Sequence, residues 1–391
     1  MILRFVPALL LALLLFLAPA APAAMQQRAG APAAEAPAAL SDEQLSRVRD
    51  AISTFMSEHQ VPGMSVALVA DGRLQWEDGF GFTDLENFVP ARPESVFRLA
   101  SISKSLTAIA VMQLAEAGKL DLDAPIQTYV PEFPEKRHEV TPRDLLSHMA
   151  GIRHYRGGEI GSTRRYRDMV EALEIFKDDP LLFEPGTRYG YSTYGYTLLG
   201  LAVERASGQD FMSYLREHVL EPSGMRRTRD DDLGALIPNR ARGYDLEDGR
   251  LVNAGLFDPS YKVPGGGIVA PAGDLARLAI ALQEGRLLGA ESWKQMTTIQ
   301  NGADTSVRQY GYGWVLGGPG MHPDSVWHTG GQQGATTILY MIPGERFAVA
   351  ILTNRRGVGP IRQLAAEIGR IALGDPAEEE TPATSGVPVG G

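Results

Sequence analysis

The chain has 391 residues, which is enough for one large domain or two small ones. Apolar residues make up 44% of it, so it can bury a substantial core. The formal net charge is −10, with acidic and basic residues mixed and no basic stripe, which argues against nucleic acid as a partner. There are no cysteines, and this excludes disulfides, zinc–thiolate sites, a cysteine nucleophile and lipid attachment at a lipobox.

The first segment, residues 1–23, has the pattern of a secretory signal peptide. A basic residue precedes the apolar run Phe5–Leu17, and residues 21–23 fit an A-x-A cleavage site. The apolar character continues to Met25, so an uncleaved anchor is the alternative, which the prolines and the short leucine-rich core disfavour. We expect a secreted or periplasmic protein, tethered to a membrane only if the signal remains uncleaved.

Two segments are predicted to lack regular structure. Residues 24–40 are rich in alanine and proline without a periodic apolar face, which indicates a linker. Residues 375–391 have the same character and are predicted to be a disordered tail. Residues 41–374 are then the folded part of the chain.

Strand patterns occur near both ends of this folded part. Ser41 and Gln44 have the spacing of a capping box, which predicts a helix with a periodic apolar face. Two strand-like runs then flank Asp71-Gly72, the signature of a two-residue β-hairpin. A second hairpin is predicted with its turn at residues 343–345, and a closing helix at residues 361–373.

The middle of the chain is mostly helical in pattern, most clearly between residues 141 and 224. Together the patterns predict an α+β fold: an antiparallel sheet built from both chain ends and flanked by helices, plus a mostly helical lobe. We expect an α/β lobe over about residues 41–130 and 255–374 and a helical lobe over about 131–254. A site is expected in the cleft between the lobes.

The stretch RLASISKSLTA places Ser101 and Lys104 three residues apart near the predicted start of a helix. Positions i and i+3 share a helix face, and a helix N-terminus favours an anion. An amine there can take the hydroxyl proton while a backbone N–H holds an oxyanion. The pair alone leaves a second interpretation open, in which Ser101 is a helix N-cap and Lys104 a solvated side chain.

Two further segments contain recognisable motifs, namely FEPGTRYGYSTYGYTLLG at residues 183–200 and VWHTGGQQGATT at residues 326–337. With SISK they follow the order and approximate spacing of Ser-x-x-Lys, Tyr-x-Asn and His-Thr-Gly. The chain therefore resembles the penicillin-recognising serine hydrolases: class C beta-lactamases, D-alanyl-D-alanine carboxypeptidases and related esterases and peptidases. The resemblance covers about residues 41–374 and implies the beta-lactamase/transpeptidase-like fold. Within the family, the motifs are most similar to the mitochondrial serine beta-lactamase-like subgroup.

The resemblance implies that Ser101 is the nucleophile, Lys104 its partner and Tyr191 a proton shuttle to the leaving group. Lys104 can act as a base only if its pKa, ordinarily near 10.4, is lowered. Otherwise it stays charged and lowers the pKa of a tyrosine. The alternative for Tyr191 is that it is one more aromatic residue among the neighbouring tyrosines at positions 189, 194 and 196.

The resemblance also implies a set of oxyanion and substrate-binding residues: Ser101, Thr193, His328, Thr329 and Gly331. The backbone N–H groups of Ser101 and Gly331 would form the oxyanion hole. Thr193 replaces the asparagine of Tyr-x-Asn with one short hydroxyl, which weakens the expected contact with the substrate carbonyl or the lysine, and beta-lactam recognition with it. His328 replaces a lysine and, at its ordinary pKa, would be roughly a quarter protonated at pH 7. We therefore expect weaker dependence on a substrate carboxylate; the alternative is a structural histidine.

Other constellations are weak. His148 and His154 lie six residues apart without an HExxH motif, so no metal site is predicted and His148 is expected to be structural. The three glycines at Gly265–Gly267 are interpreted as residues that permit a turn. No phosphate-binding loop or dinucleotide fingerprint is present, and no cofactor is expected.

These observations predict an exported serine hydrolase that forms an acyl-enzyme on Ser101 and acts on a small-molecule or peptide substrate. Peptide bonds are the first choice, and ester or beta-lactam hydrolysis is the alternative within the family. A non-catalytic module that binds a cell-wall peptide or a protein partner is the alternative outside it. The Thr193 substitution leaves that alternative open, whereas the presence of Ser101, Lys104 and Tyr191 disfavours it. The sequence gives no oligomeric state.

Overall fold

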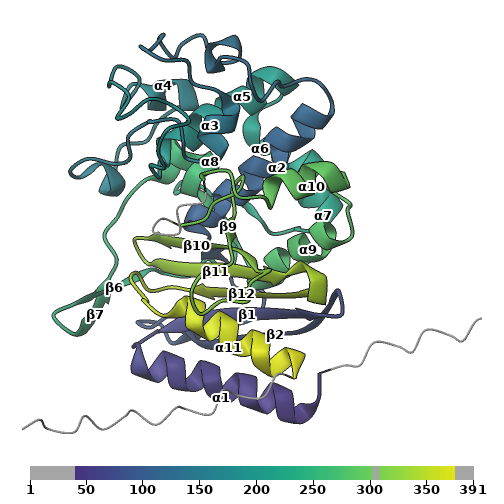
Figure 1. Ribbon diagram of the computed structural model, residues 1–391. Coiled ribbons are helices and arrows are strands. Elements are labelled where there is room, and N and C mark those ends of the chain that lie inside the picture. Colours follow the sequence, from purple (N-terminus) through teal and green to yellow (C-terminus); the bar gives the residue numbers. More distant parts are fainter. Residues whose placement is uncertain (1–39, 303–307, 375–391) are drawn as a thin grey trace, which may run out of the picture. The chain divides into compact units, whose positions relative to one another are not determined.

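Both ends of the folded chain contribute to one antiparallel sheet of seven strands (Figure 1). The computed structural model describes residues 40–302 and 308–374, all within one compact unit, Ala38–Gly391. The strand order β3-β2-β1-β12-β11-β10-β9 pairs an early strand with the last one, which confirms the predicted α+β architecture. The strands are β1 (Gly63–Ala70), β2 (Arg73–Asp84), β3 (Val89–Pro90), β9 (Val315–Leu316), β10 (Val326–Gln332), β11 (Ala335–Ile342) and β12 (Phe347–Thr353).

The two predicted hairpins are both present. Ala70 pairs with Arg73, so Asp71-Gly72 forms a two-residue turn, with φ of +51° and +70°. Positive φ at both central residues is the geometry that matches the twist of the adjoining strands. The second hairpin joins β11 to β12 through a 3₁₀ turn at Pro343–Glu345.

Helices cover both faces of the sheet. The first and last helices, α1 (Asp42–Glu58) and α11 (Ile361–Leu373), pack together against one face. The opposite face is covered by α9 (Ala272–Gln283). The predicted capping box at the start of α1 is confirmed, because the Ser41 hydroxyl accepts from the Gln44 N–H at 3.1 Å and the Gln44 side chain accepts from the Ser41 N–H at 2.9 Å.

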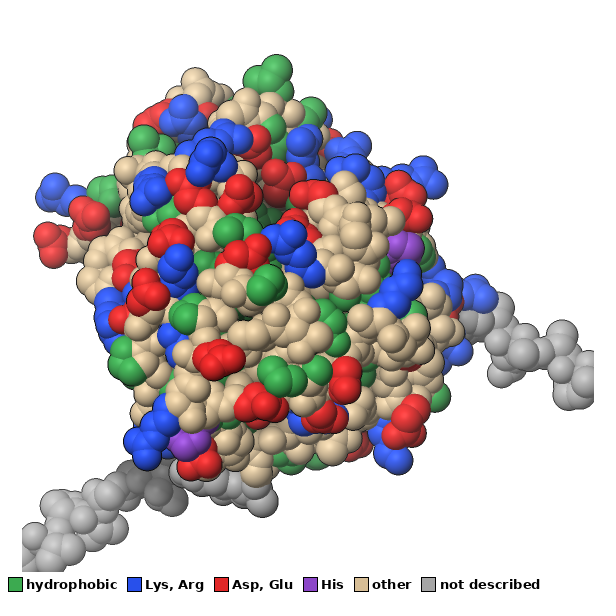
Figure 2. Space-filling model, turned by 90° about the horizontal axis from the view of Figure 1, so that it is seen from above, with side chains coloured by type: hydrophobic (Ala, Val, Ile, Leu, Met, Phe, Trp, Pro, Cys, Tyr) green, Lys and Arg blue, Asp and Glu red, His purple; other side chains and the backbone are tan. Residues whose placement is uncertain are grey.

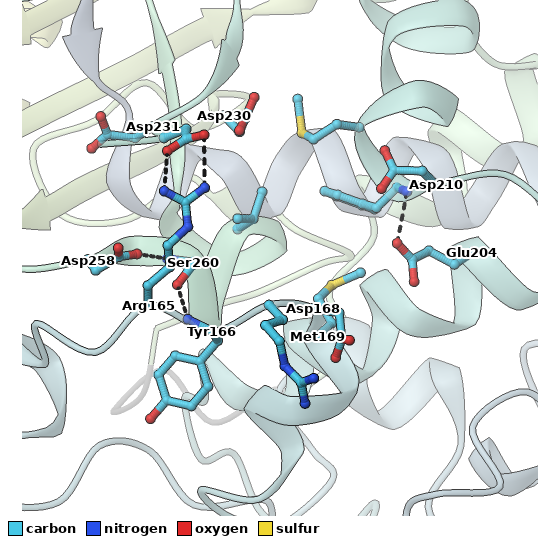
Figure 3. Close-up of a pocket in the computed structure, with 15 residues that line it drawn as sticks. Arg165, Tyr166, Asp168, Met169, Glu204, Asp210, Asp230, Asp231, Asp258 and Ser260 are labelled. Atoms are coloured by element: carbon cyan, nitrogen blue, oxygen red, sulfur yellow. Dashed lines mark hydrogen bonds and ion pairs between the residues drawn. The ribbon is translucent and has the colours of Figure 1, made fainter. Parts of the chain in front are cut away.

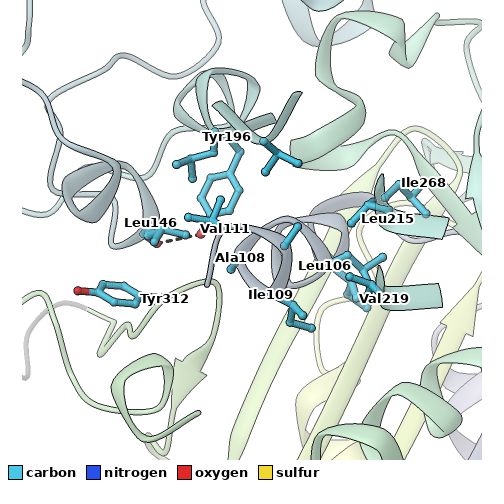
Figure 4. Packing of buried hydrophobic residues seen from close by; sticks show 14 of the residues in the cluster. Leu106, Ala108, Ile109, Val111, Leu146, Tyr196, Leu215, Val219, Ile268 and Tyr312 are labelled. Atoms are coloured by element: carbon cyan, nitrogen blue, oxygen red, sulfur yellow. Dashed lines mark hydrogen bonds between the residues drawn. The ribbon is translucent and has the colours of Figure 1, made fainter. Parts of the chain in front are cut away.

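Helix α2 (Ser103–Glu116) runs through the interior, with every residue from its start to Met112 buried. The polar side chains of its first turns are buried with the apolar ones, and only its last residues approach the surface. Figure 4 shows its Leu106, Ile109 and Val111 among buried side chains from several other elements. The surrounding helices are α3 (Pro142–Leu146), α4 (Met169–Leu173), α5 (Tyr194–Ser207), α6 (Phe211–Leu215), α7 (Glu221–Ser223), α8 (Val263–Gly266) and α10 (Ala290–Met296).

The helix pattern at residues 209–224 is interrupted in the structure. A π-helical turn, Arg216–Leu220, separates α6 from α7. Pro222 lacks the N–H that would bond to the His218 carbonyl, and its ring would clash with that carbonyl in a regular helix. The Gln113 side chain donates to the freed carbonyl at 2.9 Å, so the interruption ties this helix to α2.

Short strands complete the described part. A three-stranded sheet contains β4 (Phe97–Arg98), β8 (Ile268–Ala270) and β5 (Arg229–Asp230), and a two-stranded ribbon contains β6 (Tyr244–Glu247) and β7 (Arg250–Asn253). Strand β4 leads directly into the predicted serine–lysine segment. On the face shown in Figure 2, basic and acidic side chains are interspersed rather than gathered into a basic stripe.

The predicted signal peptide 1–23, the linker up to residue 39 and the tail 375–391 lie outside the described residues. The lobe boundaries and the secreted or periplasmic location stay predictions. Within residues 40–302 and 308–374, the helices are all too short or too polar to cross a bilayer.

The capping box generates a stability prediction. Ser41→Ala should lower the free energy of unfolding by about 1 kcal/mol, because the Gln44 N–H in the first turn of α1 loses its acceptor. Urea denaturation measures this change. Ser53→Ala, at an exposed position inside the same helix, is the matched control and should leave stability within about 0.5 kcal/mol of wild type. Equal stability of the two variants would contradict a role for the cap.

Candidate active site

Ser101 lies in a short 3₁₀ helix, η1 (Ala100–Ile102), directly before α2. Ala100 has a φ of +48°, a conformation that side-chain-bearing residues rarely adopt. Strand β10 presses on this turn, since a Cβ at Gly330 would lie 2.1 Å from the Leu99 carbonyl oxygen. The Thr337 hydroxyl donates to the same carbonyl at 2.9 Å. Two strands therefore fix the strained turn that presents the serine.

The Ser101 side chain is partly exposed, so a substrate can reach it. It does not cap α2, because the N-cap is Ile102 and no side chain bonds to the first N–H groups of that helix. Within the described residues, the Ser101 backbone N–H has no hydrogen-bond acceptor. It is therefore available to an oxyanion, as the resemblance implies.

The Lys104 side chain is fully buried, with 0% of its surface exposed. Its Nζ contacts Ser101 Oγ at 3.1 Å, Thr193 Oγ1 at 3.1 Å and the Gly265 carbonyl oxygen at 2.5 Å. The interpretation of Lys104 as a solvated side chain is therefore wrong. Among the described residues no carboxylate pairs with it, and burial, with a further contribution from Lys262, lowers its pKa well below 10.5. An uncharged amine beside a hydroxyl can accept the hydroxyl proton.

Tyr191 is the tyrosine that faces this amine. Its ring centre lies 4.9 Å from Lys104 Nζ. Burial raises the pKa of Tyr191 to about 12, although a hydrogen bond with the Ser101 side chain partly offsets this effect. The phenol therefore keeps its proton at neutral pH. The geometry supports the lowered-pKa alternative for the lysine rather than a charged lysine beside a tyrosinate.

Neighbouring tyrosines have structural partners of their own. The Tyr194 hydroxyl donates to Glu159 at 2.8 Å, and the Tyr196 hydroxyl donates to the Leu146 carbonyl at 2.8 Å. These two contacts are part of the packing of the helical region. The centre of the Tyr196 ring also lies 5.6 Å from Lys104 Nζ, but its hydroxyl is engaged by Leu146. The Tyr191 hydroxyl is instead directed to the Ser101 side chain.

Thr193 reaches Lys104 despite its short side chain. A backbone approach makes this contact possible: a Cβ on Gly265 would lie 2.6 Å from Thr193 Cγ2. The expectation of a weakened contact with the lysine is therefore wrong. Gly265 is required for close packing rather than for a turn, since its φ is not positive.

His328 differs from its sequence-based expectation. Its side chain is buried, with Nδ1 2.6 Å from the Thr329 carbonyl and Nε2 2.9 Å from the Tyr310 hydroxyl. A carbonyl can only accept, so Nδ1 carries the proton and Nε2 accepts from Tyr310. Burial lowers the pKa of His328 to about 3. The expected quarter protonation at pH 7 is wrong, because the ring has lost its contact with water.

Thr329 and Gly331 lie on β10, which packs against η1. Thr329 is partly exposed and Gly331 is exposed, with open space where a side chain would project. Gly331 directly follows Gly330, the glycine that packs against the Leu99 backbone. The structure thus places β10 beside the turn that holds Ser101, and the roles of Thr329 and Gly331 stay predictions.

Sequence reasoning missed three residues around this group: His154, Lys262 and Gln332. His154 is partly exposed and its Nδ1 accepts from the Thr193 N–H at 3.3 Å. Burial lowers the pKa of His154 to about 4. Lys262 has no distinctive sequence pattern. Gln332 lies inside the motif-bearing segment 326–337 and His154 lies six residues after His148, but neither is itself a motif position.

His148 packs under the site. Its ring centre lies 4.2 Å from that of Tyr191, and its Nδ1 accepts from the Ser192 N–H at 3.2 Å. Burial keeps its pKa well below 6.5, so the ring is uncharged. These contacts agree with the structural role expected for it.

A separate hollow of about 260 Å³ lies beyond η5 (Pro259–Lys262) and is lined by many carboxylates (Figure 3). Ser101, Lys104 and Tyr191 do not line it. Its acids have structural partners: Asp232 pairs with Arg165 at 3.0 Å, and Asp258 accepts from the Ser260 N–H at 2.9 Å. Helix caps and ion pairs account for this acidity.

Burial of Lys104 generates a stability prediction with a pH dependence. The unfolded lysine holds a proton up to about pH 10.5, whereas the folded lysine loses it at lower pH. Between these two values, wild-type stability rises with pH. Lys104→Met should therefore be more stable than wild type at pH 7, and this advantage should shrink towards pH 10 by at most about 1.4 kcal/mol per pH unit.

Urea denaturation of both proteins between pH 6 and 10 measures the difference. Lys119→Met, which removes an exposed lysine, should show no such trend. A pH-independent difference between wild type and Lys104→Met would contradict the lowered pKa.

The uncharged His328 generates a spectroscopic prediction. Nitrogen-15 NMR of the ring should show a neutral imidazole protonated on Nδ1 from pH 5 to 8, because its pKa is about 3. The signal is assigned by its loss in His328→Gln. A titration with a midpoint between pH 6 and 7 would contradict the buried geometry.

Known proteins are similar to this chain in sequence and in fold. The model of the Beta-lactamase family matches residues 48–373. The human mitochondrial serine beta-lactamase-like protein LACTB is 33% identical, over 76% of this chain and 72% of that protein. The putative penicillin-binding protein PbpX of Bacillus subtilis is 28% identical, over 71% of this chain and 68% of that protein.

Solved structures of related proteins have a fold similar to that of this chain. The octameric penicillin-binding protein homologue from Pyrococcus abyssi matches with a TM-score of 0.74 and 28% identity, over 84% of this chain and 77% of that chain. The family match extends over most of the described residues and includes all three motifs. The suspected relationship is confirmed: this chain belongs to the beta-lactamase family of serine hydrolases, which is a family of enzymes.

Proposed function

We propose that this protein is an exported peptidase that forms an acyl-enzyme on Ser101. The observation that supports this most strongly is the buried Lys104, whose Nζ lies 3.1 Å from Ser101 Oγ and whose pKa burial lowers well below 10.5. Export rests on the signal-peptide pattern at residues 1–23.

Acylation begins when Lys104 Nζ takes the Ser101 proton and Oγ forms a bond to the substrate carbonyl carbon. The carbonyl oxygen becomes an oxyanion, which the Ser101 and Gly331 N–H groups stabilise. As the carbon–nitrogen bond breaks, the Tyr191 hydroxyl gives its proton to the departing amine. The Lys104 ammonium then returns a proton to the Tyr191 oxygen. Over the step the Ser101 proton is in effect transferred to the departing amine, and Lys104 and Tyr191 return to their starting protonation states.

Deacylation follows the same path with water. Lys104 takes a proton from water as the water oxygen attacks the ester carbonyl, and Ser101 Oγ recovers a proton when it leaves. Both half-reactions need Lys104 to be uncharged at the start. Its burial against Gly265 and Thr193 provides this state without a neighbouring base.

The substrate preference is inferred from His328. An uncharged, buried ring supplies no cation to a substrate carboxylate at that position. This favours bonds inside a chain over those next to a terminal carboxylate, as in internal peptide bonds. An ester is the alternative that the same observation allows. The contact between Lys104 and Ser101 disfavours the non-catalytic binding module.

A fluorophosphonate probe tests the nucleophile. Wild type should be labelled on Ser101, as mapped by mass spectrometry of peptides, and Ser101→Ala should not be labelled. Lys104→Met should react about 10²- to 10⁴-fold more slowly, the range expected for loss of a general base. Ser53→Ala, at an exposed position, is the control and should be labelled like wild type.

Two results would overturn the mechanism. Absence of label on folded wild type would favour the binding module, and label that survives Ser101→Ala would identify another nucleophile. A series with one acyl group as a peptide, an ester and a penicillin then tests the substrate class. Hydrolysis of the ester without the peptide would replace the peptidase assignment by an esterase.

A further inference from the structure

Lys262 is a second buried lysine close to the site. It ends η5 and directly precedes α8, whose Gly265 carbonyl accepts from Lys104. Lys262 is 2% exposed. Its Nζ lies 5.0 Å from the ring centre of Phe257, 5.3 Å from that of Tyr155 and 5.4 Å from that of Tyr261. These aromatic rings stabilise an ammonium through their faces.

The Lys262 ammonium lacks a conventional partner. Among the described residues, no carboxylate lies within ion-pair distance of its Nζ and no oxygen accepts a hydrogen bond from it. A buried ammonium without a hydrogen-bond acceptor is unusual in a folded protein. The aromatic faces partly compensate the positive charge, but they do not replace oxygen acceptors. The Lys262 N–H groups can therefore still donate to a ligand.

Gln332 is a second buried donor at the same place. It follows Gly331 on β10, is 2% exposed, and its amide nitrogen has no hydrogen-bond partner. The two side chains meet around Gly266: a Cβ at Gly266 would lie 3.5 Å from Lys262 Cδ and 3.7 Å from Gln332 Oε1. The two side chains therefore approach each other next to the predicted oxyanion glycine, and the Gln332 amide nitrogen, which is a donor, has no partner.

The surrounding charge is positive. Arg98 and Arg356 both act on Lys262, and Asp231 is the acid that opposes them. The Asp231 carboxylate is already engaged, since Arg98 Nε donates to it at 2.8 Å and Arg240 lies 3.6 Å away. A net positive environment with two free donors suits an anion better than a neutral carbonyl.

We propose that Lys262 and Gln332 form a subsite for a carboxylate of the substrate, so that the enzyme prefers peptides with an acidic group. This inference rests on the proposed function. It supplies the cation that His328 does not provide, from Lys262 at the end of η5 rather than from β10. Lys262 and Gln332 are thus specificity-determining residues, separate from the groups that transfer protons.

The pH dependence follows from burial. Burial and Arg98 lower the pKa of Lys262 to about 7, while Tyr155 and Tyr261 beside it stay protonated because burial raises their pKa values. An anion binds only the charged lysine. Affinity for an acidic peptide should therefore be highest below pH 7 and fall as the pH rises through that value.

The test measures how well short peptides protect Ser101 from the fluorophosphonate probe. The peptides are pentaalanines, acetylated and amidated, with Glu or Gln at the central position, so that one carboxylate is the difference. A third peptide carries a free C-terminal carboxylate and no Glu, which separates a terminal carboxylate from a side-chain one. Labelling of Ser101 without peptide tests the proposed function independently.

Wild type should bind a carboxylate-bearing peptide about tenfold more tightly than its neutral match, the effect of one charge-assisted contact. Lys262→Met and Gln332→Leu should each bring the ratio close to one, and Lys262→Arg should retain most of it. Lys294→Met, at an exposed lysine, is the control and should keep the wild-type ratio. Thermal unfolding checks that each variant is folded.

Equal protection of wild type by acidic and neutral peptides would overturn the proposed subsite. If Ser101 is still labelled in the absence of peptide, the proposed function is unaffected by that result. A preference that survives in both Lys262→Met and Gln332→Leu would overturn it as well. If Gln332→Leu abolishes the preference and Lys262→Met does not, the Lys262 ammonium is not the group that binds the peptide carboxylate.

Discussion

The chemistry of this protein depends on one amine that is kept out of water. Lys104 can accept a proton because α2 is buried on all sides, so that an ammonium at that position would lose its hydration. The Gly265 carbonyl, the Thr193 hydroxyl and the Ser101 hydroxyl satisfy its hydrogen bonds without a negative charge. A carboxylate in the same place would hold the proton on the lysine and remove the base.

Close backbone approach brings the parts of the site together. The serine turn precedes α2, Thr193 precedes α5, and β10 comes from near the other end of the chain. Gly330 allows β10 to touch the backbone at Leu99, and Gly265 allows α8 to touch Thr193. A methyl group at either glycine would push these elements apart by more than the hydrogen bonds around Lys104 tolerate.

Charge is distributed unevenly around this centre. His148, His154 and His328 are uncharged because burial lowers their pKa values. The carboxylates near the site, such as Asp231 and Asp258, are occupied by arginines or by backbone N–H groups. Although the chain as a whole is acidic, Lys262 near the nucleophile has no carboxylate paired with it among the described residues. This arrangement suits a developing oxyanion and an anionic substrate group.

Local patterns determined much of the fold. The capping box at Ser41, the two hairpin turns and the closing helix depend on residues close in sequence, so their signals survive without tertiary information. The interruption of the helix at residues 216–220 depends jointly on Pro222 and on a hydrogen bond that the remote Gln113 side chain donates to the His218 carbonyl, which no local pattern includes.

The sequence by itself determined which residues meet: three motifs in order identified Ser101, Lys104 and Tyr191 and the family that shares them. Tertiary structure decided their protonation states, because desolvation comes from side chains that are distant in sequence. Thus burial in the fold lowers the pKa of Lys104 well below 10.5 and that of His328 to about 3. Lys262 and Gln332 could not be identified from the sequence for the same reason. Their burial without a hydrogen-bond partner arises only when segments remote in sequence pack around them.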